Sequence, residues 1–241
     1  MSMTERVRRL RQQSLDTIET LSGERAELIT AFYQQDLGPV SIPVRRALAF
    51  QYLMEHKTIC INEGELIVGT QPGLTFDTKG RVVPAAFGRR DFSSSVWAAG
   101  EAVEPFFREG MLSWAGNHKT LDYERLFEVG FVGLIEHVEG RLSRLAPAED
   151  DCRQKRDFLT ALKIVAEGYL DLSNRYADHA LRLAGEAADP ARKAELETLA
   201  RNCLRVPARP TTTFWEACQC AWFSFFFVTD ATGRVDQYIG S

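Results

Sequence analysis

Residues 158–183 read FLTALKIVAEGYLDLSNRYADHALRL, and this stretch decides the fold class. Large side chains recur in it every three or four residues, which is typical of one face of an α-helix. A stripe sustained over several turns occurs in coiled coils and in long helices packed inside bundles, and the bundle is favoured here. The stripe consists of large side chains at alternating steps of four and three residues, namely Phe158, Leu162, Val165, Tyr169, Leu172, Tyr176, His179 and Leu183.

The sequence on either side of this stretch has the same helical periodicity. Residues 58–61 and 65–69 are the exception, because they combine β-branched side chains with turn residues, which predicts short strands or extended segments. The predicted fold class is therefore mainly α with a few short β segments. The further helices are predicted at residues 7–21, 23–37, 43–56 and 122–146, and after Pro190.

Two glycines interrupt the predicted helix over residues 122–146. Gly130 and Gly133 each destabilise a helix interior by about 1 kcal/mol relative to alanine. Their presence in this pattern predicts close packing of another helix at that point.

The last predicted helix is apolar on nearly every side. It begins with a capping box, in which Glu216 follows Thr213 by three residues. A helix that is apolar all round is normally buried on all sides. Few residues follow Val228, and the first of them form a polar turn, residues 229–234, which contains Asp230. We expect that the chain is too short to cover this helix by itself.

The composition excludes several classes of protein. The chain has 241 residues, 45% of them hydrophobic, and a net charge of −4, which does not suit a general binder of nucleic acids. Its longest apolar run, residues 217–228, is shorter than the roughly 20 residues that span a bilayer. The five cysteines are scattered, and no apolar leader precedes them. These features predict a cytoplasmic protein with free thiols and with no nucleic-acid or membrane partner.

The chain lacks the familiar catalytic motifs, so neither a catalytic residue nor a metal ligand is assigned. Cys218 and Cys220 would point about 200° apart on a helix and could not face one ion. Two polar spots remain as candidates. His118 lies in the segment GNHKT and could titrate near neutrality, although an exposed loop histidine is the alternative. Asp230 could be a partly buried carboxylate, although a simple helix-terminating turn at Gly233 is the alternative.

Seven short segments occur in order along the chain: SGERAELIT (22–30), IPVRRALAF (42–50), INEGELIVG (61–69), HKTLDYER (118–125), GFVGL (130–134), TFWEACQ (213–219) and GRVDQY (233–238). Together they resemble the N-terminal part of the glycyl-radical enzymes, the pyruvate formate-lyase and glycerol dehydratase superfamily. The resemblance is strongest to the dehydratase branch, which includes hydroxyproline dehydratase and the carbon–nitrogen and carbon–sulfur lyases.

This resemblance implies a fold and a chemistry. The fold is the N-terminal part of a ten-stranded α/β barrel. In the family, an activating enzyme with an iron–sulfur cluster and S-adenosylmethionine installs a glycyl radical, which passes to a cysteine that abstracts hydrogen from a small-molecule substrate. Family members are lyases, dehydratases or formate acetyltransferase-like enzymes, and a homodimer is implied for the complete protein. His118 matches a histidine that faces substrate hydroxyls, and Asp230 roughly matches a polar position that contacts substrate.

The radical-bearing motifs of the family are absent from these residues. Gly240 does not follow an Arg-Val pair in register and no tyrosine follows it. We therefore expect residues 1–241 to be the N-terminal portion of a pyruvate formate-lyase-type domain, which binds no cofactor directly, is inactive alone and pairs with a missing C-terminal portion. The alternative is a non-catalytic helical interaction module that pairs with a separately encoded partner.

The apolar last helix generates a prediction about solubility. Each large side chain left exposed forfeits about 1.5–3 kcal/mol of burial free energy, so the isolated chain should self-associate. Polar replacements of Phe223, Phe225 and Phe227 should then increase the monomer fraction measured by size-exclusion chromatography. A sharp monomer peak of the unaltered chain would contradict this expectation.

Overall fold

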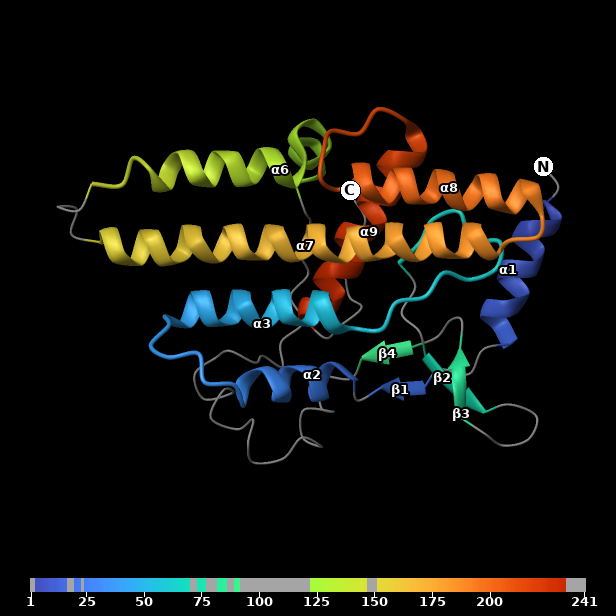
Figure 1. Ribbon diagram of the computed structural model, residues 1–241, viewed down its shortest axis with the longest axis horizontal. Coiled ribbons are helices and arrows are strands. Elements are labelled where there is room, and N and C mark those ends of the chain that lie inside the picture. The colour runs from blue at the N-terminus through green and yellow to red at the C-terminus, as the bar shows by residue number, and fades with distance from the viewer. Residues whose placement is uncertain are drawn as a thin grey trace.

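A computed structural model describes residues 3–16, 20–22, 24–69, 73–76, 82–85, 89–91, 122–146 and 151–232 (Figure 1). In these residues helices predominate, which confirms the mainly α class. The short strands pair as β1 with β4, in parallel, and β2 with β3, antiparallel. The elements are α1 (Glu5–Asp16), β1 (Thr20–Ser22), α2 (Glu24–Tyr33), α3 (Ile42–His56), β2 (Gly73–Phe76), β3 (Val82–Ala85), β4 (Arg89–Asp91), α6 (Tyr123–Leu142), α7 (Cys152–Glu186), α8 (Pro190–Arg205) and α9 (Phe214–Thr232). None of the described helices is long and apolar enough to cross a membrane.

Helix α7 is the centre of a helical bundle, between α3 and α6 on one half of its length and beside α8 on the other (Figure 1). Its buried face combines large side chains with small residues, which let neighbouring backbones approach. A Cβ at Gly168, for example, would lie 3.2 Å from the Cα of Gln51 in α3. The face includes Ala161, Ala166, Gly168, Tyr169, Leu172, Tyr176, Ala177, Ala180 and Ala184. The bundle packing of this helix is thus confirmed.

The stripe predicted along α7 is wrong at its N-terminal end. Leu172 and Tyr176 are fully buried in the core, but the side chain of Phe158 is 58% exposed and that of Leu162 is 42% exposed. Periodicity identifies the apolar face of a helix, whereas the coverage of that face depends on what packs against it.

Two other predicted features differ from the structure, and a third, the short strands or extended segments, is present without regular strands. Helix α1 ends at Asp16, and Leu21 lies in strand β1 instead of the helix predicted over residues 7–21. Residues 58–61 and 65–69 are extended or turned without a regular strand, apart from an isolated bridge at Cys60. Asp230 lies inside the last turn of α9, because that helix continues to Thr232 and takes up the turn predicted at its end.

The burial of α9 corrects the expectation about its aromatic residues. Phe223 is completely buried and packs in the main core beside Tyr176, with ring centroids 5.4 Å apart. Cys220, Gln219 and Ser224 are also buried, whereas Phe214 is 86% exposed. A polar replacement of Phe223 would therefore destabilise the fold, since truncating a buried phenylalanine costs about 3–5 kcal/mol. Phe227 has no described side chain.

Helix α6 is kinked at Gly130, which has φ 65° and ψ 177°. The kink turns two backbone amides out of the helix, and they donate to the loop that follows α8. Phe131 N–H donates to Pro207 O at 2.9 Å and Val132 N–H donates to Ala208 O at 3.0 Å. The close packing predicted here is confirmed, but its partner is a loop backbone and not a second helix.

An extended segment, residues 66–69, packs along one side of α9. Its central residue, Val68, is fully buried and pairs with the buried amide of Gln219. Val68 N–H donates to Gln219 Oε1 at 2.9 Å, and Gln219 Nε2 donates to Val68 O at 2.7 Å. We refer to these two hydrogen bonds as the Gln219–Val68 pair. One side chain thus satisfies both backbone polar groups of one buried residue, as a neighbouring strand would.

Replacing Gly130 with alanine should strongly destabilise the fold. The new Cβ would lie 2.8 Å from the Cα of Arg209 and nearer still to the Ala208 carbonyl, at a φ that L-residues rarely adopt. Overpacking alone costs about 1–3 kcal/mol, and a side chain held in this region of φ and ψ, which essentially only glycine adopts, adds about 1–3 kcal/mol. Urea unfolding measures this loss of unfolding free energy.

Gly185→Ala is the matched control for this substitution. Gly185 lies near the end of α7, and a Cβ there would meet no atom within 4 Å. Because alanine favours helix over glycine, this variant should gain about 0.5–1 kcal/mol. Equal effects of the two substitutions would contradict the role assigned to the Gly130 kink.

Replacing Gln219 with leucine should destabilise the protein by about 2–6 kcal/mol. The shape is nearly kept, but the buried N–H and C=O of Val68 lose their partners, at about 1–3 kcal/mol each. Urea unfolding and the hydrogen-exchange rate of the Val68 amide measure the effect. The control Gln154→Leu, on the exposed face of α7, should leave both nearly unchanged, and a neutral Gln219→Leu would show that the pair is dispensable.

Candidate functional site

The two residues predicted to contact substrate are only partly placed by the structure. His118 lies outside the described residues. Asp230 has a described backbone, in the last turn of α9, while its side chain lies outside what is described. The described residues therefore do not bring the two together. What they define is the surrounding framework of helices, in particular α9 and the segment that packs against it.

One part of this frame is the packing of residues 66–69 against α9. The indole Nε1 of Trp215 donates to Leu66 O at 2.6 Å, one helical turn before the Gln219–Val68 pair. One turn after that pair, Gly69 meets the ring of Trp222, to which a Cβ would come within 3.0 Å. Gly69 has φ 127°, so both its backbone and its surroundings require glycine. Residues 66–69 are thus held to α9 at three points over about two helical turns, from Trp215 to Trp222.

The first turn of α9 is fixed by the predicted capping box. Glu216 N–H donates to Thr213 Oγ1 at 3.2 Å, and Thr213 N–H donates to Glu216 Oε2 at 3.3 Å. The same carboxylate accepts hydrogen bonds from the Thr212 N–H and from Arg205 Nε. Burial disfavours the charge of Glu216, but these donors outweigh burial and lower its pKa. The start of the helix that carries Asp230 is therefore rigidly placed.

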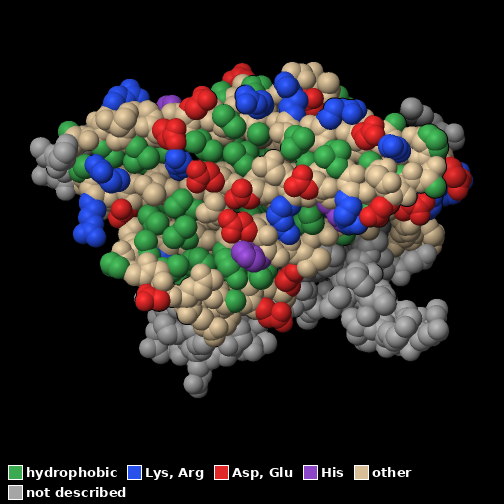
Figure 2. Space-filling model, in the orientation of Figure 1, with side chains coloured by type: hydrophobic (Ala, Val, Ile, Leu, Met, Phe, Trp, Pro, Cys, Tyr) green, Lys and Arg blue, Asp and Glu red, His purple; other side chains and the backbone are tan. Residues whose placement is uncertain are grey.

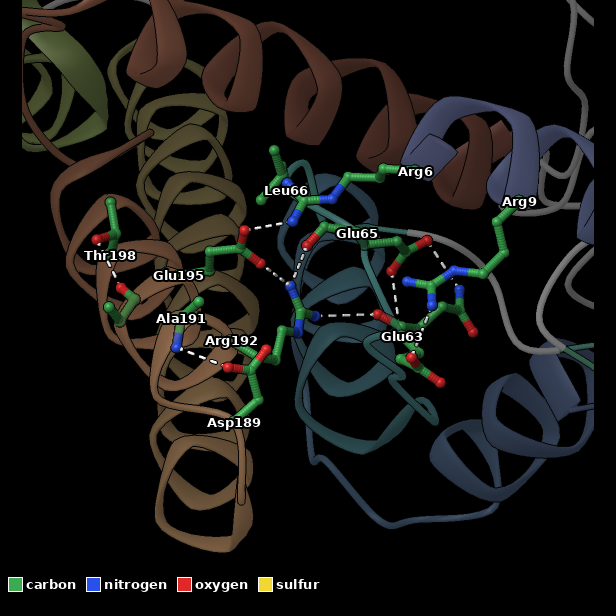
Figure 3. Close-up of polar contacts among 12 residues, drawn as sticks. Arg6, Arg9, Glu63, Glu65, Leu66, Asp189, Ala191, Arg192, Glu195 and Thr198 are labelled. Atoms are coloured by element: carbon green, nitrogen blue, oxygen red, sulfur yellow. Dashed lines mark hydrogen bonds and ion pairs between the residues drawn. The ribbon is translucent and has the colours of Figure 1, made fainter. Parts of the chain in front are cut away.

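A polar cluster joins α1, the turn at residues 62–65 and the first turns of α8 (Figure 3). Arg192 is at its centre and donates to three oxygens: Glu65 O at 2.9 Å, Asn62 O at 3.1 Å and Glu195 Oε2 at 3.1 Å. Arg6 forms an ion pair with the same Glu195.

Two further features complete the cluster and show what it does. Arg9 pairs with Glu63 at 2.9 Å. Burial disfavours the charge of Glu195, but the hydrogen bonds from Arg6 and Arg192 outweigh it and lower its pKa. Each of the three guanidinium groups thus has a protein partner. The cluster holds the turn before residues 66–69 in place and offers no free cation to a substrate anion.

Two buried thiols of the described part, those of Cys203 and Cys220, are unreactive. Burial raises the pKa of Cys203 far above its usual value and raises the pKa of Cys220 to about 12. A thiol with such a pKa is not a nucleophile near neutrality. Among the described residues, moreover, no group of three or more His, Cys, Asp or Glu side chains is arranged to hold a metal ion.

Comparison with known proteins identifies the family to which this chain belongs. The family profile described as "Pyruvate formate lyase-like" matches residues 3–89 and 99–241. The chain is 32% identical to trans-4-hydroxy-L-proline dehydratase of Clostridioides difficile, over 98% of this chain and 36% of that protein. It is 39% identical to isethionate sulfite-lyase of Desulfovibrio desulfuricans, over 48% of this chain and 15% of that protein.

A solved structure has the same fold. The glycerol-bound form of the B12-independent glycerol dehydratase from Clostridium butyricum superimposes with a TM-score of 0.78 at 26% identity, over 96% of this chain and 35% of that one. The chain thus spans about a third of the length of the two dehydratases, which is consistent with the partial barrel that the resemblance implied. These relatives give no support to a non-catalytic interaction module. The chain belongs to the pyruvate formate lyase-like family of glycyl-radical enzymes.

Proposed function

We propose that this chain is the N-terminal portion of a glycyl-radical dehydratase or related lyase, which eliminates water or another polar group from a small substrate. The observation that carries the proposal is the extent of the family match. It covers residues 3–89 and 99–241 and so includes both the helical frame and the segments with His118 and Asp230. The relatives named above remove water or sulfite, so the shared element is the loss of a polar group from a small molecule.

In this proposal His118 and Asp230 are substrate-binding residues. A histidine titrates near neutral pH and can donate to or accept from a substrate hydroxyl, which suits the departure of water. Asp230 would contact the substrate from the end of α9. The role of Asp230 is supported by the attachment of α9 to residues 66–69, because a substrate contact needs a fixed backbone behind it. The role of His118 is supported by the family match, which includes its segment.

The radical chemistry would come from residues that these 241 do not include. A separate activating enzyme would install the glycyl radical, and the complete protein would be a cytoplasmic homodimer. The chain's own part would be to bind and orient the substrate.

We predict that His118→Ala lowers turnover by roughly 10²-fold or more, the usual scale for a lost acid–base or polarising group. The measurement uses a chimera in which residues 1–241 replace the matching part of trans-4-hydroxy-L-proline dehydratase, after activation, with trans-4-hydroxy-L-proline as substrate. His56→Ala is the control, since His56 is exposed on α3 and stacks on Tyr52. Near-normal turnover of the His118 variant would leave that residue as an ordinary loop histidine.

The chimera also tests the wider proposal. Residues 1–241 alone should show no turnover, whereas the activated chimera should carry a glycyl-radical signal in electron paramagnetic resonance and eliminate water. A folded chimera that acquires the radical but acts on neither hydroxyproline nor isethionate nor glycerol would contradict the proposed substrate class.

A further inference from the structure

Two grooves flank the exposed end of α7. The larger, about 640 Å³, lies between α6 and α7 and is called here the α6–α7 groove. The smaller, about 490 Å³, lies between α7 and the helices α2 and α3. The ridge between them is formed by α7 itself, through side chains that line both grooves: Phe158, Leu162, Val165 and Tyr169. On the face seen in Figure 2, hydrophobic side chains gather along this part of the molecule.

The exposure of this ridge exceeds what its sequence pattern implies. Phe158 and Leu162 continue the stripe that is fully buried further along α7, yet they are 58% and 42% exposed. Covering both would remove their exposed apolar area from water, which favours binding. A contiguous apolar surface of this kind on a helix layer marks a binding site.

The shape of the α6–α7 groove fits a helix. Its lining runs along α6 from Phe131 to Arg141 and continues to Leu145 beyond the end of that helix, and it runs along α7 from Lys155 to Tyr169. At 1.5 Å per residue, the α7 wall is about 20 Å long, which matches an added helix of about four turns. A helix that enters such a groove presents apolar side chains at i, i+3 or i+4, and i+7.

The rim of the groove is basic. The lining includes Arg125, Arg141, Lys155 and Lys163, against one carboxylate, that of Asp122. Lys155 is paired with Asp151 at 2.8 Å and Lys163 with Glu139 at 2.5 Å. Among the described residues no carboxylate lies within ion-pair distance of the Arg125 or Arg141 guanidinium groups. Two cations therefore face the groove with their charges uncompensated by described neighbours.

The positive charge at the rim favours an acidic partner over a second copy of this chain as the occupant of the groove. In a two-fold dimer the same patch faces itself, so Arg125 and Arg141 of one copy would approach the cations of the other. Like charges at an interface are unfavourable, and a complementary partner supplies carboxylates instead. We propose that the α6–α7 groove binds an amphipathic helix of a partner polypeptide, whose apolar side chains pack on Phe158 and Leu162 and whose acidic flank pairs with Arg125 and Arg141.

Two synthetic 18-residue peptides test this proposal. Both are fluorescein-labelled and carry leucines at helical a and d spacing, one with glutamate flanks and one with lysine flanks. Binding to the 241-residue chain is followed by fluorescence anisotropy. The glutamate peptide should bind at least tenfold more tightly than the lysine peptide, and Leu162→Ala should weaken it at least tenfold. In the double variant Arg125→Glu, Arg141→Glu the preference should reverse.

Leu181→Ala is the matched control, because Leu181 lies on the same helix, is 48% exposed and lines neither groove. All the substituted side chains are exposed or at the rim, and circular dichroism verifies that each variant stays helical. Equal binding of the two peptides, or an equal effect of Leu181→Ala, overturns the proposal. So does a dimer that Leu162→Ala dissociates, which would identify a second copy, or displacement of the glutamate peptide by micromolar oleate, which would identify a lipid.

Discussion

The two hydrogen bonds between the Gln219 side-chain amide and the backbone N–H and C=O of Val68 hold two distant parts of the chain together. The residues are 151 positions apart, and both are fully buried. Water cannot replace either hydrogen bond at this depth, so the geometry of the extended segment is tied to the rotation of α9 about its axis. Trp215 and Trp222 then place Leu66 and Gly69 on the same side of the helix. The segment behaves as a strand whose neighbour is a helix.

Around this pair the molecule is organised by the small residues of α7. Gly168 and the buried alanines bring α3 and α8 close enough for Arg175 to reach the carbonyl oxygens at the end of α3, where it donates to Met54 and Lys57. The last carbonyls of a helix otherwise lack partners.

The sequence predicted those features whose signals are local. The helix after Asp189 begins where expected because Asp189 accepts from Ala191 N–H and Pro190 occupies the first helical position. The capping box of α9 likewise involves residues three positions apart. The non-local features were not predictable. The sequence gives no sign that Gln219 pairs with Val68, because the two are far apart in the chain. Gly130 indicates a close approach, but the sequence does not identify the loop at Ala208 as the partner. Asp230 was predicted in a turn after the helix but lies within α9, because no glycine or proline ends that helix before Thr232.

The way in which α1 is attached has a consequence for its response to the solvent. Two ion pairs join this helix to the rest of the chain, from Arg6 to Glu195 and from Arg9 to Glu63, while Val7 and Leu15 are 49% and 67% exposed. Ion pairs at a surface weaken as dissolved salt rises, whereas the apolar bundle does not. In concentrated brine these two pairs would contribute less to the attachment of α1, so this end of the chain responds to ionic strength more than the bundle does.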